Sequence, residues 1–202
     1  MKSKAYWNKV FWDTFFSTVG KLASHASRTG YDAQTWVEQI AKQIGVKIGE
    51  GWHFRPEWKI ERYKGSPLIV APYDVSVFAG NVALNEGLNL ITTLVCGGSG
   101  DAANNSNAQV GTGTGSTAAD PTDSALTAGV WAAMDAGYPT YGASQQMAFK
   151  GTYGPSTANQ DWKEFSVRNK STADIMLSRK VQDEGTKSSG QIWVLTVTYT
   201  GA

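Results

Sequence analysis

The sequence predicts an α+β protein that is mainly β, with an antiparallel β-sandwich in its C-terminal part and a helical arm at its N-terminus. The first observation is alternation: from Gln191 to Thr200, Trp193, Leu195, Val197 and Tyr199 occupy every second position, and three threonines, Thr196, Thr198 and Thr200, line the reverse face. Successive side chains of a strand point to opposite faces, so this spacing indicates one packed and one wetter face. The second is that polar turns separate short segments of this kind. The third is a helical spacing of aromatic residues over residues 5–27.

The bulk composition narrows the classes of protein that fit. The chain has 202 residues, enough for one substantial domain with an appendage. Its 18 basic and 17 acidic residues give a net charge of +1, which argues against a nucleic-acid binder with a basic face. Charges at Lys9, Asp13 and Lys21 interrupt the N-terminal region, so we expect neither a secretory signal nor a membrane span there. Cys96, the single cysteine, is expected to be a small buried hydrophobe.

Residues 1–45 are predicted to form an arm of two helices. Gly30 ends the first helix and Asp32 is a candidate N-cap for the second. The apolar stripe can pack on the protein's own core, on a neighbouring subunit or in a membrane interface, although interfacial helices usually have a richer Lys/Arg face. The candidate assembly interface combines the aromatic and aliphatic residues of both helices: Trp7, Phe11, Phe15, Leu22, Trp36 and Ile40.

Residues 46–80 are predicted to be an extended connector. Trp58, Ile60 and Arg62 alternate with charged and polar residues, as in a strand with two mixed faces. Prolines in this segment favour sheet edges and connections over central strands. They are Pro56, Pro67 and Pro72.

The domain from residue 81 to 202 is predicted to begin with a helix and to continue as the sandwich. The helix is expected from Val82 to Val95, stopped by Gly97 and Gly98, and it would cover an edge or cap one end. Its predicted buried stripe is Leu84, Leu88, Ile91 and Val95. A long irregular stretch, 97–124, follows with a brief strand near Ala108 to Gly111. Five further strands are expected, at Val130–Asp135, Gln145–Tyr153, Trp162–Arg168, Ile175–Val181 and Gln191–Thr200.

The sequence contains no recognisable catalytic motif, and we expect no catalytic residue, no cofactor and no metal site. His25 and His53 have no partner at metal-ligand spacing. The glycine-rich run from Gly111 to Ser116 lacks the lysine that a phosphate-binding loop requires, and we expect a flexible or partner-ordered loop instead. The protein is therefore expected not to be an enzyme.

Polar and aromatic residues leave weaker alternatives. Three aspartates in or near the polar loops could supply oxygen ligands to calcium, but their spacing matches no calcium loop; they are Asp101, Asp120 and Asp123. Glu164 and Arg179 lie on neighbouring strand candidates, and we expect them to form a structural ion pair. Trp131 and Trp162 are the candidates for an aromatic patch that stacks on sugar rings.

Several short runs occur in order along about residues 81–200. They are Asn85 to Leu88, Asn104 to Gly113, Met134 to Pro139, Phe149 to Gly154, Trp162 to Glu164, Met176 to Val181, Gly185 to Lys187 and Trp193 to Thr198. Together they resemble a family of tailed-bacteriophage virion proteins, described as phage structural or tail-fibre-like proteins. Residues 1–80 lie outside the resemblance.

The resemblance implies a non-enzymatic structural protein located in the virion, at the tail, the neck or the fibre attachment. Its partners would be other virion proteins and sister subunits in a homo-oligomer, with no nucleic acid and no membrane. Capsid decoration is the close alternative within that class. A host-surface carbohydrate-binding module and a hydrolytic depolymerase are alternatives from other classes.

Overall fold

The computed structural model describes residues 54–171 and 174–201. They belong to the second of the two units into which the chain divides, which begins at Trp52. The predicted helical arm and the six residues of the candidate assembly interface therefore lie outside the described residues.

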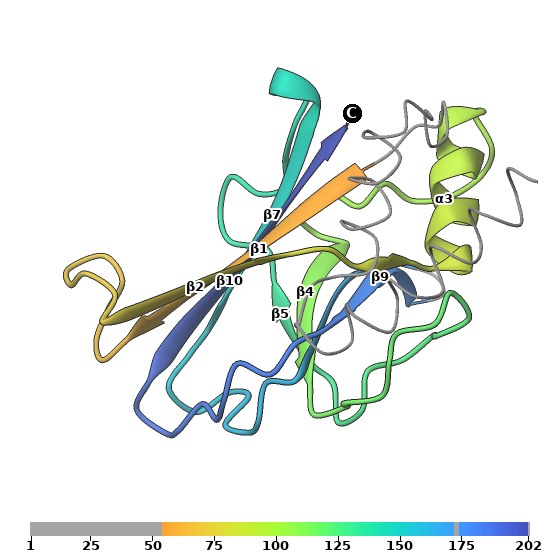
Figure 1. The fold of residues 1–202 in the computed structure, drawn as a ribbon. Coiled ribbons are helices and arrows are strands. Elements are labelled where there is room, and N and C mark those ends of the chain that lie inside the picture. The colour runs from red at the N-terminus through yellow and green to blue at the C-terminus, as the bar shows by residue number, and fades with distance from the viewer. Residues whose placement is uncertain (1–53, 172–173, 202) are drawn as a thin grey trace, which may run out of the picture. The chain divides into compact units, whose positions relative to one another are not determined.

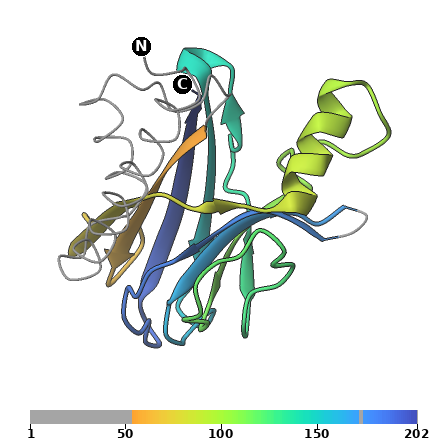
Figure 2. The same cartoon turned by 45° about the vertical axis from the view of Figure 1, so that its right-hand side comes forward.

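Two five-stranded antiparallel sheets form the described fold (Figures 1 and 2). The strands of the first sheet are, in order, β2 (Asp74–Ala79), β1 (Phe54–Tyr63), β10 (Ile192–Gly201), β7 (Gln146–Tyr153) and β6 (Thr140–Tyr141). The strands of the second are β3 (Val82–Ala83), β9 (Ile175–Val181), β8 (Glu164–Asn169), β4 (Ala108–Gly113) and β5 (Val130–Ala133). A helix, α3 (Asn85–Val95), and a short 3-10 turn, η1 (Ala143–Gln145), complete the described elements. The predicted mainly β sandwich is confirmed.

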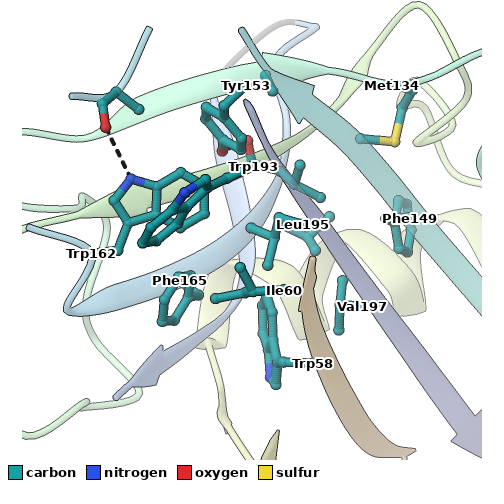
Figure 3. Packing of buried hydrophobic residues seen from close by; sticks show 14 of the residues in the cluster. Trp58, Ile60, Met134, Phe149, Tyr153, Trp162, Phe165, Trp193, Leu195 and Val197 are labelled. Carbon is teal, nitrogen blue, oxygen red and sulfur yellow. Dashed lines mark hydrogen bonds between the residues drawn. The ribbon is translucent and has the colours of Figure 1, made fainter. Parts of the chain in front are cut away.

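The core lies between the two sheets and is rich in aromatic rings (Figure 3). Trp162 is fully buried in it, with the ring centroids of Tyr153 and Trp193 at 4.7 and 4.8 Å in edge-on contact. Its indole N–H donates to the carbonyl of Ala158 at 3.0 Å, so the buried ring leaves no unpaired donor. The alternating residues of β10 predicted to share one face do so: their side chains are buried, at Trp193, Leu195, Val197 and Tyr199.

Close approach of the two sheets depends on a glycine in β7. A Cβ atom built on Gly151 would lie 2.7 Å from a methyl group of Val110 on β4 and 3.0 Å from the Cβ of Ala132 on β5. Atoms at such distances overlap, so a larger residue at this position would force the sheets apart.

The described part of the predicted connector forms two strands of the first sheet instead. β1 is a central strand between β2 and β10, and Trp58 and Ile60 are fully buried in the core. Pro56 lies at the end of the ladder between β1 and β2: its carbonyl accepts the N–H of Gly80, which is just beyond the last residue of β2. The missing proline N–H thus falls where the ladder with β2 ends. The alternation of Trp58, Ile60 and Arg62 therefore indicated this strand correctly, whereas the prolines favoured an edge or a connection.

The prediction for the helix was wrong in its start and, at Leu88 and Val95, in its buried stripe, whereas Leu84 is buried as predicted. β3 occupies the first two residues, and α3 begins at Asn85. The helix contacts β9 through its first turn: a Cβ on Gly87 would lie 2.5 Å from the Cα of Leu177, and Glu86 accepts the N–H of Met176. Its later turns extend away from the sheets (Figures 1 and 2). Leu88 and Val95 are consequently exposed.

The expectation that Cys96 is buried was also wrong. The cysteine follows the last residue of α3 as its C-cap, and its side chain is exposed. The cysteine has apolar neighbours in the sequence, but in the described fold this end of the helix extends away from both sheets.

Two buried tyrosines have their hydroxyl groups paired inside the sandwich. The Tyr153 hydroxyl donates to the carbonyl of Val110 at 2.8 Å. The hydroxyl groups of Tyr199 and Ser178 lie 2.6 Å apart. Burial raises the pKa of both phenols above its usual value, because the interior disfavours a phenolate.

We predict that Tyr199→Phe lowers stability at neutral pH but weakens the loss of stability at alkaline pH. A free phenol ionises near pH 10 whereas the buried one stays protonated, so stability falls as the pH rises from about 10 toward the raised pKa. The variant also leaves Ser178 without its partner, at a cost of about 1 kcal/mol. Urea unfolding at pH 7 and between pH 9 and 11.5 measures both effects. The exposed Tyr141→Phe is the control, and equal alkaline slopes for both variants would contradict the prediction.

Candidate functional site

A buried cluster of charged groups joins the second sheet to the loop between β4 and β5. Glu164 on β8 is 0% exposed and Arg179 on β9 is 3% exposed. The register places Arg179 opposite Ser166, so the two charged residues are diagonal neighbours on adjacent strands. Glu164 Oε2 accepts a hydrogen bond from Nε of Arg179 at 2.7 Å, and Nη2 of the same guanidinium lies 2.7 Å from this oxygen. The expected ion pair is confirmed. We call these two residues, together with Asp123, the Glu164 cluster.

The second carboxylate oxygen of Glu164 binds the backbone of the loop. Glu164 Oε1 accepts the N–H of Gly115 at 2.9 Å and the N–H of Thr127 at 2.6 Å. A Cβ on Gly113 or Gly115 would lie 2.5 or 2.6 Å from this oxygen. Gly113 and Gly115 therefore provide room for a buried carboxylate rather than for a phosphate. The run begins inside β4, and its loop is fastened to the sheet.

Arg179 links the cluster to a second point of the same loop. Its Nη1 donates to Asp123 Oδ2 at 2.7 Å, and the same oxygen accepts the N–H of Asp120. Burial lowers the pKa of Arg179, but the hydrogen bonds to Asp123 and Glu164 outweigh it, so the net shift is upward. The Asp120 carboxylate accepts both the N–H and the hydroxyl of Thr122, which lowers its pKa. The turn is thus held by its own side chains.

The arrangement of the Glu164 cluster favours structural over acid–base chemistry. Both oxygens of Glu164 accept from N–H donors, Nε and Nη1 of Arg179 donate to carboxylates, and Nη2 lies 2.7 Å from Glu164 Oε2. A general acid or base must face the proton that it transfers, whereas these groups face one another. What the cluster can do is fix the path of the loop from residue 114 to 128.

A second charged cluster surrounds Arg62 on the first sheet. Its guanidinium donates to Asp74 and to Glu184, each at 2.8 Å, and to the Ser76 hydroxyl at 2.7 Å. It also lies 4.5 Å from the ring centroid of Trp193. The cluster joins β1, β2 and the turn before β10. A planar guanidinium can donate several hydrogen bonds at once in fixed directions, which a lysine ammonium does not do.

Lys187 is buried, and the oxygens that accept its hydrogen bonds are uncharged. Its ammonium donates to the Gly154 carbonyl and to Asn159 Oδ1, each at 2.8 Å. Burial lowers its pKa, because the interior disfavours the charged amine. The lysine fastens the loop after β7 to the turn before β10. Sequence analysis missed both Lys187 and the Arg62 cluster, although the spacing of Arg62 in phase with Trp58 and Ile60 placed it on the core face of β1.

The other predicted site residues are dispersed. Within residues 54–171 and 174–201, no group of three or more histidine, cysteine, aspartate or glutamate side chains could hold a metal ion. Asp123 and Asp120 are engaged in the loop as described above. Trp162 is buried and Trp131 is partly buried, with the Arg168 guanidinium 4.3 Å from its ring centroid. The pair therefore forms no exposed aromatic patch. His25 and His53 lie outside the described residues.

Comparisons with known proteins found no family model, no curated protein and no solved structure that matches this chain. Among the described residues, no helix has the length and apolar character needed to cross a membrane.

We predict that Arg179→Met lowers the free energy of unfolding by about 3–5 kcal/mol, because the Glu164 charge is then left buried without its cation. Urea denaturation gives the difference. The control is Lys163→Met, whose ion pair with Asp161 is partly exposed and should contribute less than about 1 kcal/mol. Similar losses for the two variants would show that the Glu164 cluster has no special role.

Proposed function

We propose that the protein is a non-enzymatic structural subunit of a tailed-phage virion. In this role, the N-terminal helical arm attaches the β-sandwich module at the tail, the neck or the fibre attachment. The observation that carries the proposal is the ordered series of runs between residues 81 and 200 that resembles phage structural proteins.

The places of these runs in the fold support a shared architectural role. The run Phe149 to Gly154 covers the last five residues of β7, including Gly151, and Met176 to Val181 covers most of β9. The run from Trp162 to Glu164 contains a core residue and the carboxylate of the Glu164 cluster. The resembling segments thus include residues that set sheet spacing, loop path and core packing. These places support a common scaffold, whereas a scaffold does not by itself determine a function.

Exposed apolar side chains on the sandwich also support an assembling role. Isolated surface hydrophobes are ordinary, but consecutive or neighbouring ones often mark contact surfaces. They gather on the segment from residue 68 to 77: Leu68, Ile69, Val70, Tyr73, Val75 and Val77.

The proposal predicts that purified particles contain this chain in a fixed number of copies. Quantitative mass spectrometry of particles banded on a density gradient measures the ratio of the chain to the major capsid protein. A constant ratio across preparations is expected, and gold-labelled antibodies would then distinguish the tail from the capsid surface. Absence of the chain from infectious particles would contradict the proposal.

We further predict that Phe11→Asp together with Phe15→Asp abolishes incorporation into particles, because two charges interrupt the apolar stripe predicted for the arm. Lys9→Gln with Lys21→Gln is the matched control, since it changes the net charge by the same two units and spares the stripe. Incorporation is measured by particle mass spectrometry after complementation, and circular dichroism of each purified chain reports folding. If the Phe11 and Phe15 variant unfolds the sandwich, the stripe belongs to the protein's own core instead.

A further inference from the structure

The outer edge of β2 is the longest free strand edge in the described fold. Among the four edges formed by residues 54–171 and 174–201, β3 and β6 have two residues each, β5 has four and β2 has six. Short edge strands are one means by which proteins avoid unwanted pairing. β2 also lacks the other usual safeguards, since Asp74 to Ala79 contains no lysine and no proline, and its register with β1 is continuous.

The register of β2 shows which backbone groups face outward. The N–H of Gly80 donates to the carbonyl of Pro56, which continues the pairing of Ala79 with Glu57. In an antiparallel ladder, the residues that bond to a given neighbour alternate along the strand. Ser76 and Phe78 therefore face β1 with their backbone groups. The N–H and C=O groups of Val75, Val77 and Ala79 point away from the sheet.

Side chains around this edge are apolar and exposed. Val77 is 58% exposed, and it lies on the outer face with Val75 and Ala79, opposite to the core face of Phe78. The loop that leads into β2 adds Leu68 and Ile69, which are 96% and 83% exposed. The N–H of Ile69 donates to the Ser66 carbonyl, so that these two side chains are carried on a hydrogen-bonded turn. Figure 1 shows this loop projecting beyond the strand ends.

We propose that β2 pairs antiparallel with β2 of a second copy of this chain, about a two-fold axis at Val77. The sheet that contains β2 in one copy then continues into the same sheet of the other copy. Val77 faces the partner's Val77, and Val75 faces the partner's Ala79. Each of these outward pairs exchanges two backbone hydrogen bonds, giving about six bonds across the axis.

The sequence of β2 argues for a second copy as the occupant. In this register only apolar or small side chains meet across the axis, and the one charged residue, Asp74, lies at the strand end and is already paired with Arg62. No like charges on β2 oppose one another, as they would if a lysine or glutamate were near the centre. The two-fold also places the loop of each copy beside the carboxyl end of the partner's β2, where its exposed apolar side chains enlarge the contact. Such an isologous contact closes on itself as a dimer.

This inference rests on the geometry of β2 and not on a place in a virion. A chain that dimerises through β2 but is absent from particles would refute the proposed function alone. A chain found in particles whose β2 edge stays free would refute the dimer alone.

The test measures the full chain by sedimentation equilibrium from about 1 to 200 µM, together with amide hydrogen exchange at Val77. The expected result is a dimer of twice 21.7 kDa, and slower exchange at Val77 as the concentration rises. Val77→Pro removes only the outward N–H and should raise the dimer Kd about tenfold or more while the ladder with β1 remains. Val77→Lys places two like charges at the axis and should raise the dimer Kd similarly.

Val95→Lys is the matched control, because it introduces the same charge at an exposed valine on α3 and should leave the Kd unchanged. Repeating the series with Phe11→Asp and Phe15→Asp separates pairing of β2 from association through the arm. If Val77→Pro fails to fold by circular dichroism, Val77→Lys and the exchange rate decide. Exchange at Val77 that is independent of concentration, or a dimer that survives Val77→Lys, would overturn the proposal.

Discussion

Packing of the two sheets around the Trp162 indole is the constraint on which the described fold depends. Its ring contacts Tyr153 on β7 and Trp193 on β10, while its N–H is satisfied by Ala158. Gly151 allows the facing strands to approach closely enough for this packing. Close-packed interiors tolerate little change in volume, so these positions fix the spacing of the sheets and hence the directions in which the outer strands point.

Buried charged groups hold the loops and turns that lie outside the aromatic core. The Glu164 cluster holds the loop after β4, Arg62 joins β2 to the turn before β10, and Lys187 holds the loop after β7. Ion pairs in an interior offset the desolvation of their own charges only when hydrogen bonding is nearly complete. Here side chains supply most of the partners, and backbone N–H and C=O groups supply the others. The result is a sandwich with an aromatic core, a few buried and paired charges, and exposed apolar side chains at the edge formed by β2.

Period-two alternation was enough to predict most strands, because burial of one face is a local property of the sequence. It placed Ile175–Val181 at its observed bounds and placed the strand that ends with Tyr153 to within one residue. The helical pattern did not predict the exposure of Leu88 or Cys96, because an apolar stripe shows which face of a helix is apolar and not whether a sheet lies beneath that face. The Glu164–Arg179 pair was predictable from neighbouring strands. The loop donors from Gly115 and Thr127 were not, since they depend on contacts distant in sequence.

The central claim is that this chain acts by fitting against other subunits, with its β-sandwich as a rigid module. A cryo-electron microscopy reconstruction of purified particles tests it most directly, since a sandwich of two five-stranded sheets is recognisable at intermediate resolution. The account predicts density into which the described residues fit as one body, in contact with neighbouring virion proteins. A reconstruction in which other chains account for all ordered density at the tail, neck, fibre attachment and capsid surface would contradict it.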